Sequence, residues 1–145
     1  MTLTEVQEDL FLAPQGYYLV HCISGDYALG AGIAKQFNSI FDMRYRLHKE
    51  HPIPEGKKYA NVGDALLVGN VFNLVTKPLC YHKPKMDDLY DTLIDLREQC
   101  EQLHINKLAM PKIGCGLDKL CWCDVKDMIE EVFEDTDIDI LVCYL

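Results

Sequence analysis

Two glycine-containing stretches stand out because each places a bare backbone beside polar side chains. "AMPKIGCGLDKL" (109–120) has Cys115 between two glycines, with Asp118 shortly after, and "SGDYALGAGIA" (24–34) has a similar spacing of glycines. A backbone without side chains at alternate positions can curl so that several N–H groups point at one anion. Two such loops at neighbouring strand ends could hold a diphosphate from both sides. The alternative is that both are ordinary tight turns.

Neither stretch matches a standard nucleotide-binding fingerprint. In "GAGIAK", Lys35 stands where the third glycine of G-x-G-x-x-G belongs, and no G-x-x-x-x-G-K-[ST] sequence occurs. The formal net charge of −9 also repels phosphate groups and argues against a broad basic surface for nucleic acid. A phosphate site in this chain would therefore depend on backbone N–H groups and helix N-termini, which bind anions even in an acidic protein.

The seven cysteines offer two further kinds of chemistry. "CWC" at 121–123 together with Cys115 lacks the repeated pair spacing of a zinc site, so we expect no metal. A thiol nucleophile, Cys22 or Cys115 paired with His21 or His82, remains an alternative that requires a lowered thiol pKa. The start of the chain, "MTLTEVQEDLF", has no basic segment followed by an apolar run. We therefore expect an intracellular protein with reduced thiols.

The elements that must position the two loops are strands alternating with helices. Apolar runs predict strands at 3–6, 17–23, 64–69, 71–76, 107–110 and 138–145. Helical periodicity predicts helices at 31–37 and 41–50, split near Asn38-Ser39, at 86–103, and at 124–133 with Asp124 as N-cap. The segment 51–63 reads as a connector. This alternation predicts a largely parallel sheet covered on both faces, with ligands beyond the carboxyl ends of its strands.

Length and hydropathy set the overall class. A chain of 145 residues is expected to form one domain, 1–145, that buries about 68–70% of its unfolded surface. No apolar stretch approaches the roughly 18 residues of a membrane helix, so no membrane association is expected. We also expect a monomer.

Five segments in this order resemble a macrodomain, and most closely the terminal ADP-ribose protein glycohydrolase subgroup. The segments are "VQEDLF", "HCISGDYALGAGIA", "NLVTK", "HKP" and "MPKIGCGLDKL", and the match continues to the terminal "VCYL". Where macrodomains generally have an Asn-Ala-Ala-Asn run after the second strand, this chain has "HCIS", as the lysine-using subgroup does. The resemblance implies a three-layer α/β/α sandwich on a central mixed, mostly parallel sheet.

The resemblance also implies ADP-ribose as the ligand, with no cofactor, and assigns the pocket residues. Asp9 would accept a hydrogen bond from the adenine amine, with Leu10 beside it. The diphosphate and distal ribose would lie between two walls of the pocket. One wall consists of Ser24, Gly30, Ala31, Gly32 and Ile33, and the other of Lys112, Ile113, Gly114, Cys115, Gly116 and Leu117. Leu145, which matches the subgroup's last residue, would lie near the ligand. Glu8 replaces the family's usual glycine and would be strained if that position needs φ > 0.

In the subgroup a lysine and an aspartate carry the reaction, and they correspond to Lys77 and Asp118. A lysine amine attacks a sugar aldehyde carbon only when unprotonated, and an ordinary lysine is neutral in about one molecule in 2,500 at pH 7. We therefore expect Asp118 to accept and donate protons in the bound complex. The implied reaction removes ADP-ribose that is ester-linked to acidic protein side chains: Asp118 assists ribose opening, Lys77 forms a Schiff base at C1″, and water releases ADP-ribose.

Three alternatives stay open beside this interpretation. The pocket could bind ADP-ribose without turnover, or the reaction could use a thiol. The same enzyme could instead act on O-acyl-ADP-ribose, ADP-ribose 1″-phosphate or ADP-ribose on nucleic acid. The acidic net charge disfavours long DNA but not a nucleotide end. The expected partners are ADP-ribose and ADP-ribosylated proteins.

Overall fold

A six-stranded sheet with the order β1-β6-β5-β2-β4-β3 runs through the computed structural model, which describes residues 1–145. Its strands are β1 (Thr2–Gln7), β2 (Tyr18–Ser24), β3 (Ala65–Val68), β4 (Val71–Lys77), β5 (Lys107–Met110) and β6 (Asp139–Tyr144). All neighbouring strands are parallel except β3 and β4, which form an antiparallel hairpin. The predicted mixed, mostly parallel sheet is confirmed.

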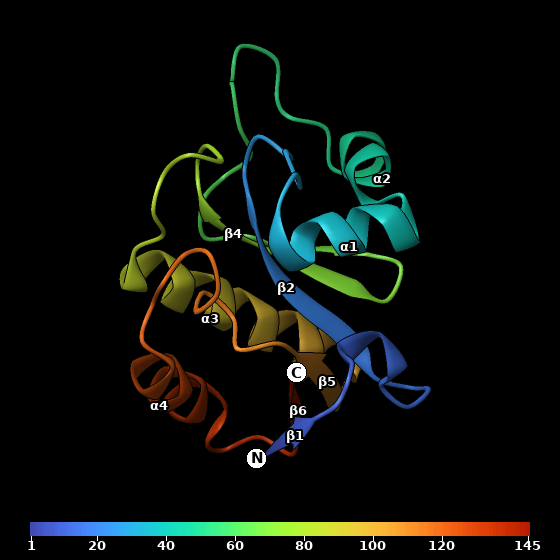
Figure 1. The fold of residues 1–145 in the computed structure, drawn as a ribbon, viewed down its shortest axis with the longest axis vertical. Helices are drawn as coiled ribbons and strands as arrows, with labels where there is room; N and C mark the ends of the chain where they lie inside the picture. Colours follow the sequence, from blue (N-terminus) through green and yellow to red (C-terminus); the bar gives the residue numbers. More distant parts are fainter.

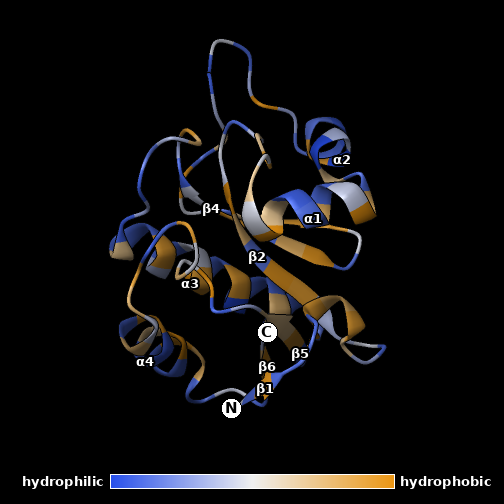
Figure 2. Cartoon of the chain, in the orientation of Figure 1, coloured by the Kyte–Doolittle hydropathy of each residue, from blue (hydrophilic) through white to orange (hydrophobic).

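Helices cover both faces of the sheet (Figure 1). The short 3-10 helix η1 (Leu10–Leu12), α1 (Gly32–Phe41) and α2 (Met43–Glu50) pack on one face, and α3 (Met86–Leu103) and α4 (Trp122–Phe133) on the other. Alternate residues of β2 supply the two cores, because Leu19 and Ile23 pack toward α1 while Val20 packs toward α3. Figure 2 shows that β2 is largely apolar, whereas much of the surface of α2 is hydrophilic. The predicted three-layer sandwich is confirmed.

Two predicted helix boundaries are wrong. α1 continues through Asn38-Ser39 and ends at Asp42, which adopts a left-handed conformation with φ 54°. The Asn38 side chain does not break α1 but accepts a hydrogen bond from the Arg44 amide, at 2.9 Å, in the first turn of α2. α4 begins at Trp122, so Asp124 lies in its first turn instead of at the N-cap. An aspartate in the first turn still interacts favourably with the helix dipole.

The other predicted elements lie where the sequence pattern puts them, within about two residues. The segment 51–63 connects α2 to β3 without helix or strand, and the hairpin turns at Gly69, whose φ is +58°. None of the helices combines the length and the apolar character that a membrane crossing requires.

A buried histidine sits between β2 and α1. His21 is fully buried, its Nε2–H donates to Asn73 Oδ1 at 2.6 Å, and its ring stacks on Phe37 with centroids 3.8 Å apart. Its Nδ1 has no hydrogen-bond partner. Burial disfavours the charged ring and lowers the pKa of His21 to about 4, although the Asn73 contact opposes the shift. His21 is therefore a neutral core group.

We expect this histidine to make the protein less stable in mild acid. The unfolded chain takes up a proton on His21 near pH 6.5, whereas the folded chain does so only near pH 4. The contribution is complete above pH 6.5 and is lost as the pH falls to about 4, on the order of 3 kcal/mol in total. Urea unfolding at a series of pH values should show a smaller acid loss for His21→Gln than for wild type. His104→Asn, at an exposed left-handed helix cap, should keep the wild-type slope; equal slopes for wild type and His21→Gln would contradict the assignment.

Candidate active site

A cavity of about 1000 Å³ opens at the carboxyl ends of the parallel strands, where the loops after β1, β2, β4 and β5 meet the end of β6. Every site residue predicted from the sequence lines it: Asp9, Leu10, Ser24, Gly30, Ala31, Gly32, Ile33, Lys77, Lys112, Ile113, Gly114, Cys115, Gly116, Leu117, Asp118 and Leu145. Crevices at this edge of parallel sheets are the usual ligand sites of such folds. The topology thus brings the predicted residues together.

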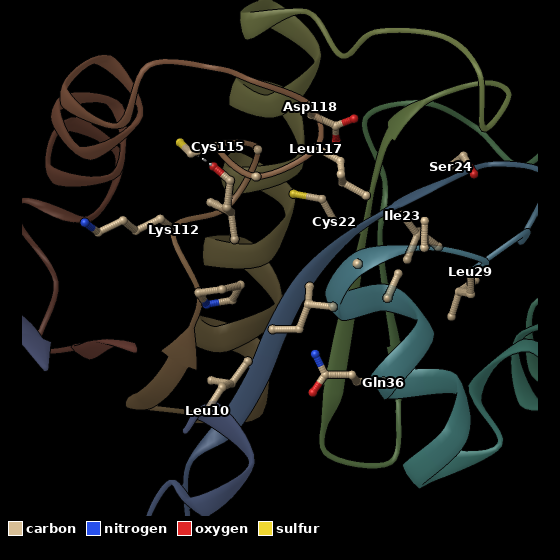
Figure 3. A pocket seen from close by; sticks show the side chains of 18 of the residues that line it. Leu10, Cys22, Ile23, Ser24, Leu29, Gln36, Lys112, Cys115, Leu117 and Asp118 are labelled. Atoms are coloured by element: carbon tan, nitrogen blue, oxygen red, sulfur yellow. Dashed lines mark hydrogen bonds between the residues drawn. The ribbon is translucent and has the colours of Figure 1, made fainter. Parts of the chain in front are cut away.

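The two glycine loops face each other across this cavity. They follow β2 and β5, which pair in parallel, so both leave the sheet at the same edge. A Cβ atom built on Gly32 would lie 3.1 Å from Leu117 Cδ1, which shows how closely the start of α1 approaches the second loop. In Figure 3, Leu117 and Asp118 extend from that loop over the strand that carries Cys22 and Ser24. The predicted juxtaposition of the loops is confirmed.

The first loop was expected to curve through its glycines, but two of its residues with a left-handed conformation are not glycines. Tyr27 and Leu29 have φ of 57° and 44°, whereas Gly25 and Gly30 have ordinary φ values. A left-handed side-chain residue costs about 1–2 kcal/mol. Burial of both side chains and a 2.8 Å hydrogen bond from the Tyr27 hydroxyl to the His51 carbonyl hold this conformation. Sequence reasoning missed it because apolar residues give no signal for positive φ.

The start of α1 offers a row of free backbone donors. No side chain caps the helix at Ala31, and the amides of Gly30, Gly32 and Ile33 make no hydrogen bond within the protein. The second loop adds the amides of Gly116 and Leu117, which are likewise without a partner. Such groups at a helix N-terminus and a neighbouring loop form an anion site without requiring a cationic side chain.

Asp26 ties the first loop to the segment that follows β4. Its Oδ1 accepts hydrogen bonds from the Ser24 hydroxyl at 2.6 Å and the Ala28 amide at 3.2 Å, and its Oδ2 accepts one from the Cys80 amide at 3.0 Å. Burial opposes ionisation of this carboxyl, but the hydrogen bonds outweigh burial and lower the pKa of Asp26. Asp26 was not predicted, although its position in "SGD" is typical of a side chain that caps a turn.

Lys77 and Asp118 form an ion pair at one end of the cavity. Lys77 Nζ lies 2.8 Å from Asp118 Oδ1, and the two side chains are only 14% and 18% exposed. The carbonyl of Lys77 accepts a 2.8 Å hydrogen bond from the Gly25 amide, so the first loop fixes the backbone of this lysine. The contact gives a direct path for moving a proton between ammonium and carboxylate. An amine deprotonated in this way is a nucleophile in a partly water-shielded pocket.

At the other end of the cavity, Asp9 caps η1 through a 3.0 Å hydrogen bond that its Oδ1 accepts from the Phe11 amide. Its second carboxylate oxygen has no hydrogen-bond partner in the protein. Glu8 does not have a positive φ, so the strain considered for this position is absent. Lys112 Nζ lies 4.8 Å from the centroid of the Tyr144 ring. This end combines one free acceptor with aromatic surface.

The cavity also includes residues that the sequence did not single out as ligand-binding: Glu8, Phe11, Gln36, Cys80, Tyr81, His82, Lys83, Cys143 and Tyr144. Gln36, Cys143 and Tyr144 lie in segments that the sequence assigns to helix or strand, where periodicity explains a residue without reference to a ligand, and the other six lie between the assigned elements. Gln36 is labelled in Figure 3, one helical turn after the start of α1.

The thiols lack the properties of a nucleophile. Burial raises the pKa of Cys22 to about 12, and the nearby Asp118 carboxylate adds to that shift. Burial likewise raises the pKa of Cys115 to about 11, whereas a reactive thiol needs a lowered pKa. His21 is occupied with Asn73. No group of three His, Cys, Asp or Glu side chains is arranged to hold a metal ion.

Comparisons with known proteins show that nearly the whole chain is similar to ADP-ribose glycohydrolases and macrodomains. No protein-family model matches the chain. The ADP-ribose glycohydrolase OARD1 of Bos taurus is 41% identical over 141 residues, which cover 97% of this chain and 90% of that protein. The DNA ADP-ribosyl glycohydrolase of Thermus aquaticus is 26% identical over 121 residues, which cover 80% of this chain and 34% of that protein. The solved macrodomain of Thermus aquaticus DarG has a TM-score of 0.83 at 25% identity, covering 99% of both chains.

Gly25 and Gly30 provide a matched test of how the first loop is held. A Cβ on Gly25 would lie 2.8 Å from the Ala60 carbonyl oxygen and 3.0 Å from Tyr59 Cβ, whereas the nearest atom to a Cβ on Gly30 would be the Ala28 carbonyl oxygen at 3.9 Å. We expect Gly25→Ala to lower the free energy of unfolding by about 1–3 kcal/mol. Gly30→Ala should change it by less than about 0.5 kcal/mol. Urea denaturation checks both values, and equal stability of the two variants would show that Gly25 is not tightly packed.

Proposed function

The chain belongs to the macrodomain family and is a hydrolase, and we propose that it releases ADP-ribose from an ester with an aspartate or glutamate side chain of a protein. The observation that carries the proposal is the shielded Lys77–Asp118 ion pair, 2.8 Å long, at the end of a cavity lined by free backbone amides. Similarity to an ADP-ribose glycohydrolase over 97% of the chain supports ADP-ribose as the part of the substrate that the cavity binds.

The cavity suits ADP-ribose along its length. The amides of Gly30, Gly32 and Ile33 and those of Gly116 and Leu117 would bind the diphosphate from two sides. The free oxygen of Asp9 would accept a hydrogen bond from the adenine amine beside Leu10. This arrangement directs the distal ribose toward Lys77 and Asp118.

The two charged residues would divide the chemistry. Asp118 takes a proton from the Lys77 ammonium across their hydrogen bond, which leaves a neutral amine below C1″ of the distal ribose. The amine attacks C1″, and Asp118 returns the proton to the ring oxygen as the bond between C1″ and that oxygen breaks. Asp118 then accepts the second proton from the bound nitrogen and passes it to solvent, while the substrate's carboxylate leaves from C1″ and the C=N bond of the Schiff base forms. Water then hydrolyses the resulting Schiff base, which regenerates Lys77 and releases ADP-ribose. The ester bond is broken with one water consumed, and no metal or cofactor takes part.

The same chemistry would deacylate O-acyl-ADP-ribose, because that molecule is also an ester of the distal ribose. A nucleic-acid-linked substrate is a second candidate, favoured by the 26% identity to a DNA ADP-ribosyl glycohydrolase. The net charge of −9 favours the protein-linked ester over long DNA. A pure binding module would not need a shielded lysine–carboxylate pair, so the pair favours an enzyme.

Removing either member of the pair should abolish turnover. We expect Lys77→Ala and Asp118→Ala to release ADP-ribose from an ester-linked ADP-ribosyl peptide at least about 100-fold more slowly than wild type. Lys119→Gln is the matched control, because it removes a lysine next to Asp118 that does not line the cavity. It should retain wild-type activity. The measurement is single-turnover release of ADP-ribose followed by chromatography.

Binding measured beside turnover separates an enzyme from a binding module. Isothermal titration calorimetry should show ADP-ribose binding to wild type and to Lys77→Ala, because the backbone amides remain. Full turnover by Lys77→Ala would rule out the lysine mechanism, and heat without turnover in wild type would identify a binding module.

A further inference from the structure

A second cavity continues from the reactive end of the first. It has a volume of about 460 Å³ and is lined by Val62, Pro78, His82, Lys83, Lys85 and Asp88. His82 and Lys83 line both cavities, and Pro78 directly follows Lys77. We refer to these six residues as the exit groove. A chain attached to the distal ribose beyond the scissile bond would leave the active site over His82 and into this groove.

The exit groove is positively charged in an otherwise acidic protein. It holds two lysines and one carboxylate, and neither Lys83 nor Lys85 takes part in any ion pair of the structure. Both lysines are exposed. The other two lysines that line the first cavity differ in this respect, since Lys77 and Lys112 each face a carboxylate. Unpaired lysines beside the exit from an active site are available to a negatively charged substrate segment.

The charge pattern fits a peptide better than a nucleic acid. A nucleic acid presents a phosphate at every nucleotide and needs a continuous basic surface, whereas Asp88 interrupts the positive charge here. A few side-chain carboxylates can each reach one lysine. Tyr81, which is 75% exposed and packs edge-on against His82, adds an apolar surface at the rim for a peptide backbone.

From this continuity and charge we propose that the exit groove binds acidic residues that flank the ADP-ribosylated side chain, so that Lys83 and Lys85 give the enzyme a preference for modified sites in acidic stretches of protein. The inference rests on the proposed function, because it requires a protein-linked substrate. Lys83 and Lys85 act on substrate recognition and not on the reacting atoms.

The test uses two synthetic peptides that each carry a single ester-linked ADP-ribosyl glutamate, flanked by glutamates in one and by glutamines in the other. Wild type should have a KM about fivefold lower for the acidic peptide at low salt, with similar kcat, since two exposed charge contacts give an effect of this size. The advantage should shrink at 300 mM salt. The double variant Lys83→Gln/Lys85→Gln should lose the preference, so that its KM values for the two peptides are equal.

Arg44→Gln/Lys49→Gln is the matched control. It removes the same charge from α2, on the opposite side of the molecule from the segment between β4 and α3 (Figure 1), and should keep the preference. Equal KM values of wild type for both peptides, or a preference that survives in Lys83→Gln/Lys85→Gln, would overturn the groove assignment and leave the proposed function intact. No turnover of either peptide by wild type would overturn the proposed function itself. If Lys83→Gln/Lys85→Gln instead lost turnover only of an ADP-ribosylated oligonucleotide, and not of the two peptides, the groove would be assigned to nucleic acid and not to acidic peptide.

Discussion

The parallel pairing of β2 with its neighbours β5 and β4 is the constraint on which the site depends. Parallel neighbours end at the same edge of a sheet, so the segments after them are forced into contact whatever their separation in sequence. The loop after β2 supplies the curved backbone and the N-terminus of α1. The loop after β5 carries Asp118 and the last position of β4 is Lys77, so these two residues, 41 apart in the chain, lie 2.8 Å from each other. An antiparallel partner in either place would have sent one of these groups to the far edge.

An acidic protein that is to hold a diphosphate needs donors that carry no formal charge. Backbone amides meet this requirement because their dipoles are fixed by the fold and remain directed when the overall field is repulsive. The cost appears in the backbone, where Tyr27 and Leu29 adopt left-handed conformations that glycine would adopt more easily. Both side chains are almost completely buried, so the core that they help to fill holds the strained loop in place. Local strain at the site is thus balanced by packing beneath it.

Much of the fold could be predicted from the sequence, because strand and helix patterns are set by periodic burial, whereas the residues expected in the site came from the resemblance to macrodomains. The two helix boundaries that differ involve Asn38 and Asp124. Asn38 bonds to the next helix, and Asp124 lies inside a first turn that begins at Trp122. Neither outcome has a periodic signal. The left-handed Tyr27 depends on a contact with His51, 24 residues away, and the triple acceptor Asp26 on a contact with Cys80, 54 residues away. Sequence spacing alone does not encode such contacts.

Asp26 also helps to hold the backbone around Lys77, whereas the segment beyond Cys80 is exposed. Its carboxylate joins the loop after β2 to the Cys80 amide, only three residues beyond Lys77, and the Gly25 amide bonds to the Lys77 carbonyl. The lysine backbone is therefore held from both sides before any ligand binds, and in the proposed reaction this would limit the entropy lost when the amine is aligned for attack. Beyond Cys80 the chain is exposed at Tyr81 and Lys83. The hydrogen bonds of Asp26 thus end at Cys80, and the exposed side chains that follow would face a chain leaving the ribose in the proposed complex.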